Sequence, residues 1–301
     1  MINKTENSFL NVQSSIIETF TSFEDKDHSS IHFDSWERDE GGGGKTYVIE
    51  DGKFFDNCAV NFSSIQGKEL PKTALANNLN KDVKFGYRAM GVSVIAHPNN
   101  PHVPTSHMNV RLFGILDKNK DICDWWIGGG YDLTPYIPYK EDAISWHSEA
   151  KECLNSINTG YYSTFSENCN NYFNIPHRNE RRGIGGIFFD NITDLSLEDS
   201  VKMLKSVANS YTNSYKKIVD KRKNLDFDEL QKEFQLIRRG RYIEFNLVYD
   251  RGTLFGLQSK GRIESILASL PKNAKWTYKK KNIFEKMEQN LLEVINKDWN
   301  V

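Results

Sequence analysis

The chain has 301 residues, 38% of them hydrophobic, which is enough for a sizeable buried core in one large domain or two smaller ones. Its 39 lysines and arginines nearly balance 40 aspartates and glutamates, so the net charge of -1 gives no general attraction for nucleic acid or an anionic membrane. No apolar run approaches the roughly 20 residues of a membrane span, and the first residues lack the parts of a signal peptide. We therefore expect a cytoplasmic protein with no nucleic-acid or membrane partner.

The predicted elements begin with a helix over residues 11–22 and its flanks, within an N-terminal helix region of residues 1–30. Segments typical of strands follow, separated by Gly, Asn and Pro turns: 47–50, 54–61, 91–97, 107–116 and 124–127. Helices are then predicted over 142–154, 196–215 and 226–236, and strands over 241–249 and 253–257. The Asn-rich stretch 155–171 is expected to be a solvated connection.

This order of elements indicates the fold class. Strands in two blocks, with helices between them and at both ends, favour α+β over regular βαβ alternation. No internal repeat or domain linker is visible, so we expect a single domain, residues 1–301, on a largely antiparallel sheet.

The block of residues 91–135 concentrates the residues that carry chemistry. His107, Asn109 and Arg111 recur at every second position, which places all three on one face of a strand. If the two predicted strands of this block pair as a hairpin, His97 and His107 converge.

Two glycine clusters invite a ligand-binding interpretation. Residues 41–44 resemble a phosphate-binding loop, but that motif needs glycine where Asp39 stands and a helix where strand-like residues follow. That match therefore fails, and two interpretations stay open: closely approached backbone at which Arg38 and Lys45 meet a substrate anion, or a plain mobile loop. Residues 128–130 follow two tryptophans, so we expect backbone that a flat ligand approaches closely, with Asp132 either at the ligand or as a turn residue.

The arginines indicate an anionic ligand. Arg251 and Arg262 stand beside glycines, where guanidinium groups suit carboxylates, which arginine binds in a bidentate fork. Others are expected to form ordinary salt bridges: Arg178, Arg181, Arg182, Arg238, Arg239 and Arg241. A substrate with several carboxylates would account for so many arginines.

Metal and thiol chemistry have weaker support. Four histidines fall in motif-rich segments, but no short ligand spacing such as HExxH exists, so a metal site stays open: His97, His107, His147 and His177. The four cysteines are scattered without a CxxC pair, which argues against a zinc site or a disulfide scaffold.

From about Trp36 to Trp299, nearly the whole chain resembles the oxygen-dependent coproporphyrinogen III oxidases of haem biosynthesis. The resemblance rests on five blocks: WERDEGGGGKTYVIEDGKFFDNCAVNFSSIQGKELP, AHPNNPHVPTSHMNVR, DWWIGGGYDLTPY, HRNERRGIGGIFFD and RRGRYIEFNLVYDRGTLFGLQSKGRIESILASLP. Together these blocks are far more specific than a lone glycine motif.

The resemblance implies aerobic oxidative decarboxylation of two propionate groups of coproporphyrinogen III to vinyl groups, which gives protoporphyrinogen IX. It implies O2 as the oxidant, release of CO2, and no flavin, haem or nicotinamide. It also implies a homodimer with contacts around residues 242–277, and a flat antiparallel sheet with helices on both faces.

Residue roles follow from the resemblance by position. His107 matches the proposed proton donor, and Asp132 and Arg111 match residues that act at the pyrrole and the reacting propionate. Substrate-contacting positions match Ser93, Asn109, Val110, Arg111, Lys260, Gly261 and Arg262. In bacterial members a divalent metal is described at the positions of His97, His107, His147 and His177.

Three positions depart from the family pattern: Ala59 replaces a usual glycine, Asn191 a second aspartate, and Lys260 a common glycine. The last departure leaves the substrate contact of Lys260 open. A non-catalytic tetrapyrrole carrier is the alternative function, since it would use the same arginines and glycines without needing Asp132.

Overall fold

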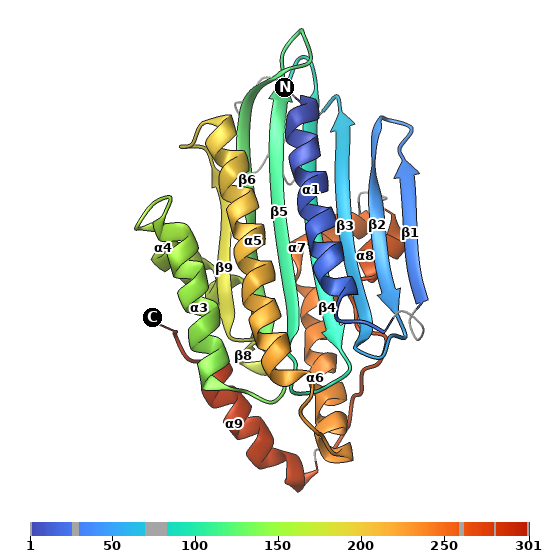
Figure 1. Cartoon of the computed structure of the whole chain (residues 1–301), viewed down its shortest axis with the longest axis vertical. Coiled ribbons are helices and arrows are strands. Elements are labelled where there is room, and N and C mark those ends of the chain that lie inside the picture. The colour runs from blue at the N-terminus through green and yellow to red at the C-terminus, as the bar shows by residue number, and fades with distance from the viewer. Residues whose placement is uncertain (1, 26–29, 70–82, 259–261, 280, 300) are drawn as a thin grey trace.

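The computed structural model describes residues 2–25, 30–69, 83–258, 262–279, 281–299 and 301. Its centre is a seven-stranded sheet of order β1-β2-β3-β4-β5-β6-β9, in which all neighbouring strands are antiparallel (Figure 1). The strands are β1 (Ser30–Glu37), β2 (Gly42–Glu50), β3 (Phe55–Gly67), β4 (Tyr87–Pro98), β5 (Thr105–Leu116), β6 (Ile122–Thr134) and β9 (Gly185–Ile192). The first six form a meander, and β9 completes the edge beside β6.

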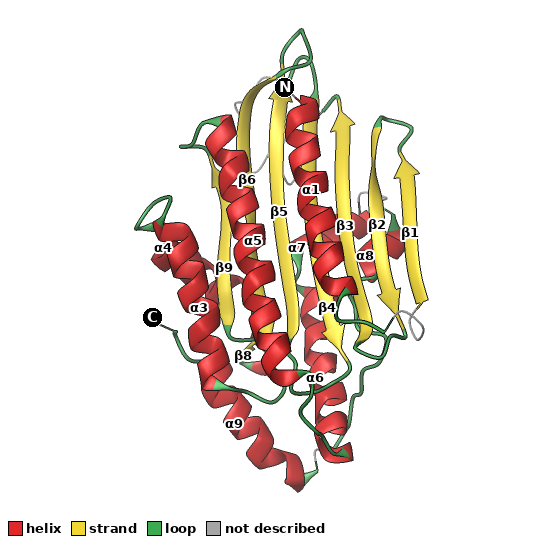
Figure 2. Ribbon diagram, in the orientation of Figure 1, coloured by secondary structure: helices red, strands yellow, loops and turns green. Residues whose placement is uncertain are grey.

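Helices cover both faces of this sheet (Figure 2). One face carries α1 (Ile2–Thr21) and α5 (Leu197–Arg222), with α3 (Lys140–Asn155) beside α5. The other face carries α6 (Glu229–Val248), α7 (Arg251–Gln258) and α8 (Ile263–Leu267). The remaining elements are α4 (Tyr161–Tyr172), α9 (Glu285–Ile295), the short strands β7 (Asn174–Ile175) and β8 (Glu180–Arg181), and the 3-10 turns η2 (Pro176–Arg178) and η3 (Asn282–Phe284). The α+β prediction is confirmed, as is the antiparallel sheet covered on both faces.

The main core lies between the sheet and the layer of α1 and α5. Val92, Met108 and Val110 of the central strands are fully buried there, together with Ile16 of α1 and Tyr211 of α5. Because side chains alternate between the faces of a strand, the intervening residues of β4 and β5 point to the opposite face. The period-two pattern of residues 107–111 therefore predicted this strand correctly.

The strands predicted over residues 241–249 and 253–257 are wrong, because both segments are helical, in α6 and α7. A capping box formed by Asp228 and Gln231 starts α6. The buried residues of its second half recur at helical spacing: Arg238, Arg239, Tyr242, Phe245 and Asn246. The prediction ends the helix at residue 236 and assigns the aromatic and branched residues that follow to a separate strand.

Other differences concern segments that were not predicted to be a helix or a strand. The stretch 155–171, predicted as a connection, contains most of α4, whose buried residues include Phe165 and Cys169. Strands β1 and β9 and helix α9 were not predicted. In β1 only Trp36 is partly buried, so the apolar Ile31 and Phe33 of this edge strand alternate with polar residues without facing the core.

The glycines of residues 42–44 belong to β2 and do not form a phosphate-binding loop. A Cβ at Gly44 would lie 2.3 Å from Cζ2 of Trp36, so this strand needs glycine because the indole of β1 covers it. No helix within the described residues is long and apolar enough to cross a membrane.

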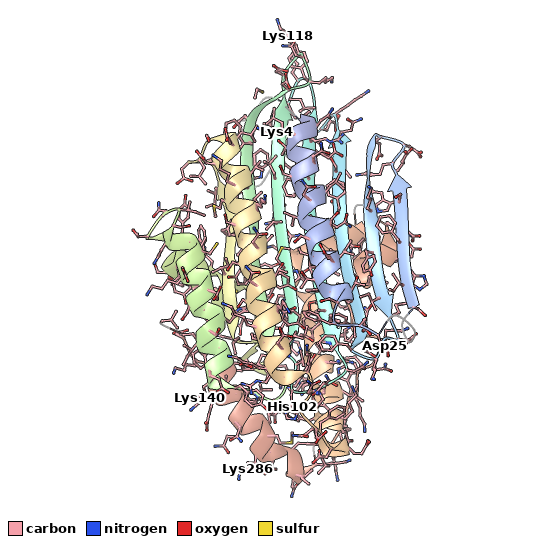
Figure 3. The ribbon with its side chains drawn as sticks, in the orientation of Figure 1. Lys4, Asp25, His102, Lys118, Lys140 and Lys286 are labelled. Carbon is pink, nitrogen blue, oxygen red and sulfur yellow. The ribbon has the colours of Figure 1, made fainter. Side chains whose placement is uncertain are left out.

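The two hairpin connections of the central strands lie at opposite ends of the sheet, as the labels on His102 and Lys118 show (Figure 3). The β4–β5 connection is anchored to the rest of the fold. His102 bonds to the carbonyl of Asp226 at 3.1 Å and to the Tyr139 hydroxyl at 2.8 Å. Gln235 of α6 donates to the carbonyl of Pro98 at 3.0 Å, so the hairpin that carries the candidate site is held at its end.

Candidate functional site

The sheet face opposite α1 and α5 has a floor of small and polar side chains at its centre. Residues paired across antiparallel strands share a face, so two rows cross the sheet in register. One row is Ser63, Gly91, Arg111 and Gly128, and the next is Asn61, Ser93, Asn109 and Gly130. Ser93, Asn109 and Arg111 are half-buried, so the residues predicted to contact a substrate come together on this floor.

His107 and Asp132 lie opposite each other on β5 and β6, next to these rows. The Nδ1 atom of His107 is 3.0 Å from Oδ1 of Asp132, and the Asp132 side chain is only 2% exposed, against 26% for His107. Asp132 is therefore a strand residue and not a turn residue. Of the two, His107 is the one that reaches the open face.

A buried arginine completes this pair. Nη2 of Arg182 donates to both carboxylate oxygens of Asp132, at 2.7 and 2.8 Å. The guanidinium lies over the ring of Phe173 at 4.1 Å and over the ring of Tyr242 at 4.6 Å. Its Nη1 donates to Asn246 at 2.9 Å, so α6 supplies much of its environment.

The charges of this cluster fix its protonation. Burial acts to raise the pKa of Asp132, but the charge of Arg182 and the hydrogen bond from His107 outweigh it and hold the pKa below its ordinary value. An ionised carboxylate only accepts hydrogen bonds, so Nδ1 of His107 carries a proton. Within the described residues, Nε2 of His107 has no hydrogen-bond partner, which leaves it available to exchange a proton.

Arg111 lies farther along the same face. Its Nη2 donates to Oδ1 of Asp190 on β9 at 2.9 Å, and its Nη1 donates to Asn109 at 3.3 Å. The Arg111 side chain is 43% exposed, so this predicted carboxylate anchor is within reach of a ligand. Arg251, at the start of α7, lies 4.8 Å from the ring of Tyr172 and is 62% exposed.

Helix α8 covers the part of this face on β2 and β3. Ser265 bonds to the Thr46 hydroxyl at 2.9 Å, and its carbonyl accepts from Asn61 at 3.1 Å. Arg262, just before α8, donates to Asp34 at 2.6 Å. The predicted carboxylate ligand Arg262 is thus tied to β1, on the far side of the floor from Arg251.

Three other residues were expected to contact the substrate: Val110, Lys260 and Gly261. Val110 is fully buried in the core on the opposite face, so only its backbone is near its neighbours on the floor. Lys260 and Gly261 lie outside the described residues.

The structure does not bring the four candidate metal ligands together. His97 bonds through its two ring nitrogens to the Thr105 hydroxyl and the Ser269 carbonyl, each at 3.0 Å. His147 likewise bonds to Tyr162 and to the carbonyl of Ile184.

His177 bonds to Tyr249 and Glu244. Burial lowers the pKa of His97 to about 3 and that of His147 to about 4, which keeps both rings neutral. Across the described ranges, no three His, Cys, Asp or Glu side chains group in a way that could hold a metal ion. These histidines therefore do not fit a shared metal site.

The predicted hairpin forms, but the side chains of His97 and His107 do not meet. β4 and β5 do form a hairpin, with His107 opposite Ile95. The His97 ring turns to Thr105 and lies edge-on to Tyr242 at 5.0 Å, while His107 turns to Asp132. The two rings share a face but take part in separate hydrogen-bond systems.

Sequence reasoning missed Arg182 and Asp190 as parts of the site. Both stand in the block HRNERRGIGGIFFD, which was noted for its arginines. A signal existed in the two glycines that begin β9, since Gly185 and Gly186 adopt φ values of 76° and 154°. A Cβ at Gly186 would lie 2.2 Å from the Tyr131 carbonyl oxygen, so these glycines allow close approach beside Asp132.

Together, the fold and the site define an α+β protein whose sheet face is suited to a flat ligand with several carboxylates. The sequence model of the family described as coproporphyrinogen III oxidase matches residues 4–300. The chain therefore belongs to the coproporphyrinogen III oxidase family, oxidoreductases of haem biosynthesis whose substrate is coproporphyrinogen III.

Proposed function

We propose that this protein catalyses the aerobic oxidative decarboxylation of two propionate groups of coproporphyrinogen III, giving the two vinyl groups of protoporphyrinogen IX. The observation that carries this proposal is the His107–Asp132–Arg182 cluster, which adjoins a floor of small side chains and the exposed guanidinium of Arg111. A proton-exchanging group and a carboxylate anchor thus share one sheet face.

The proposed reaction balances without an organic cofactor. For each propionate, the β-carbon loses a hydrogen with its two electrons, and the bond to the carboxylate breaks, releasing CO2 and leaving the vinyl group. O2 accepts the two electrons together with that proton and one more from solvent, which gives hydrogen peroxide. In this proposal the electron-rich pyrrole supplies the driving force, and the substrate takes the place of a redox cofactor.

The protein contributes binding, orientation and proton transfer. Arg111 binds the reacting propionate, while Ser93 and Asn109 contact the macrocycle from the floor. His107 exchanges protons with the substrate through Nε2. Both carboxylate oxygens of Asp132 already accept hydrogen bonds from Arg182, and one also bonds to His107, so Asp132 acts on the substrate through His107. A direct contact of Asp132 with the pyrrole N–H would require this cluster to rearrange.

The proposal extends to assembly. We propose a homodimer with contacts in residues 242–277, which include the end of α6, α7 and α8. Exposed apolar side chains in this region support it: Leu247, Val248, Leu257, Ile263, Leu267 and Trp276. Sedimentation should give twice the chain mass, and a monomer at micromolar concentration would contradict the dimer.

Incubation with coproporphyrinogen III in air and under nitrogen tests the reaction. In air we expect protoporphyrinogen IX to form, with two CO2 released and two O2 consumed for each substrate molecule. Under nitrogen we expect no turnover. Binding without CO2 release would instead identify a tetrapyrrole carrier, and turnover without oxygen would refute the proposed oxidant.

A further inference from the structure

Asp190 connects two arginines that come from distant parts of the chain. Its Oδ1 accepts from Nη2 of Arg111 on β5 at 2.9 Å, and its Oδ2 lies 4.0 Å from Nη2 of Arg251 at the start of α7. Each arginine thus approaches a different oxygen of one carboxylate. Asp190 is 29% exposed, so this junction lies at the surface of the candidate site.

The backbone beneath this junction is adapted to it. A Cβ at Gly128 would lie 2.7 Å from Oδ1 of Asp190 and 2.9 Å from Nε of Arg111. The ion pair between Arg111 and Asp190 therefore passes directly over Gly128, and any side chain at this position would displace it. This contact gives Gly128 a physical role that is separate from strand formation.

Both arginines retain hydrogen-bonding capacity. A guanidinium has five N–H donors, and in the described residues Arg111 uses its donors only toward Asp190 and Asn109. Arg251 rests on Tyr172 by a cation–π contact at 4.8 Å. The remaining donors of both groups are available to a carboxylate.

We propose that Asp190 is a positioning residue that holds Arg111 and Arg251 together as a clamp for one propionate carboxylate of the substrate. The inference rests on the proposed function for the identity of that carboxylate. Without Asp190 the two like charges repel each other; with it, the three groups carry a net charge of +1, which one propionate neutralises. The clamp therefore binds a single carboxylate and sets the position of the macrocycle on the floor.

The variant Asp190→Asn tests this assignment because it keeps the side-chain shape and removes the charge. We expect KM for coproporphyrinogen III to rise about tenfold, equivalent to about 1.4 kcal/mol, with little change in kcat. The Kd of coproporphyrin III, an oxidised analogue that is not turned over, should rise by a similar factor in a fluorescence titration. Asp194→Asn is the matched control, since Asp194 is exposed and bonds to the Tyr161 hydroxyl, and it should leave both values unchanged.

Gly128→Ala provides an independent perturbation of the same contact. We expect a similar rise in KM and Kd, and the double variant Gly128→Ala/Asp190→Asn should be little worse than either single variant, because both break one interaction. Additive effects, an unchanged Kd, or tighter binding by Asp190→Asn would overturn the clamp. A fall in melting temperature with unaltered Kd would assign Asp190 a structural role instead.

The Kd measurement separates this inference from the proposed function. If the wild-type protein binds coproporphyrin III but does not turn over coproporphyrinogen III, the proposed reaction fails. The effect of Asp190→Asn on Kd still decides whether the clamp exists.

Discussion

Replacing Asp132 by asparagine should destabilise the protein and nearly abolish turnover. The carboxylate neutralises Arg182, which is itself 2% exposed and enclosed by Phe173, Tyr242 and Phe245. Removing one partner of a buried ion pair costs about 3–5 kcal/mol, because the other charge is left uncompensated. At about 2 °C per kcal/mol for a chain of this size, we expect the melting temperature to fall by about 6–10 °C.

A second substitution checks this reasoning. Arg182→Met on the Asp132→Asn background removes the stranded charge and places an apolar chain among the three aromatic rings. The double variant should therefore melt higher than Asp132→Asn alone, in differential scanning calorimetry at neutral pH. If Asp132→Asn melts within about 1 °C of the wild type, the carboxylate does not compensate Arg182 and the argument fails.

The same variant has a kinetic consequence. Without the anion at Nδ1, His107 loses the partner that fixes its tautomer and ring orientation. Loss of a positioned acid–base group costs about 10²–10⁴ in rate, so kcat should fall in this range at a temperature where the variant stays folded. Binding of coproporphyrin III should change little, since Asp132 is buried. A wild-type rate of oxygen consumption would refute the role.

Three further predictions concern separate parts of the molecule. His107→Asn should lower kcat about 10²–10⁴-fold without lowering the melting temperature as Asp132→Asn does, because Arg182 keeps its counter-ion; steady-state kinetics and calorimetry test this. The ring nitrogens of His97, His147 and His177 are already hydrogen-bonded, so we expect these residues not to bind a metal ion. Chelator treatment should leave activity unchanged, and elemental analysis of protein purified without a histidine tag should find no stoichiometric metal. Burial opposes ionisation of Glu244, but its hydrogen bonds from Arg178, His177 and Trp276 prevail and lower its pKa to about 2. The contribution of ionised Glu244 to stability is therefore present above pH 4.5 and is lost as the pH falls toward 2. In Glu244→Gln the free energy of unfolding should depend less on pH in that window.

The central strands could be predicted because their periodicity is a local property. One face of β5 is set by the alternation of His107, Asn109 and Arg111 with buried residues, and this pattern needs no knowledge of partners. Which residues of the neighbouring strands lie opposite those of β5 could not be predicted from the sequence pattern. Gly128 and Gly130 were expected to approach a ligand, but their place inside β6, opposite Arg111 and Asn109, follows only from the register.

The second half of α6 shows why a local pattern fails where tertiary packing decides. Tyr242 and Phe245 favour strands intrinsically, yet both pack against Arg182 from one side of a helix. Fifty residues separate Asp132 from Arg182, and no spacing rule connects them. The resemblance supplied the roles of His107 and Arg111, whereas the ion pair that holds Asp132 had to be seen in the structure.

Exposure separates two uses of arginine within this one site. Arg182 is 2% exposed and already bonded to a carboxylate inside the fold, so exchanging that partner for a ligand would strand a buried charge. Arg111 and Arg251 are 43% and 62% exposed, and Asp190 together with water compensates their charge when no ligand is bound. A substrate carboxylate can therefore exchange with solvent at the exposed pair at little cost, while the buried arginine fixes the charge state of the catalytic cluster. In the sequence, Arg111, Arg182 and Arg251 have the same chemical capacity; their burial determines which holds the fold and which are free to bind propionate.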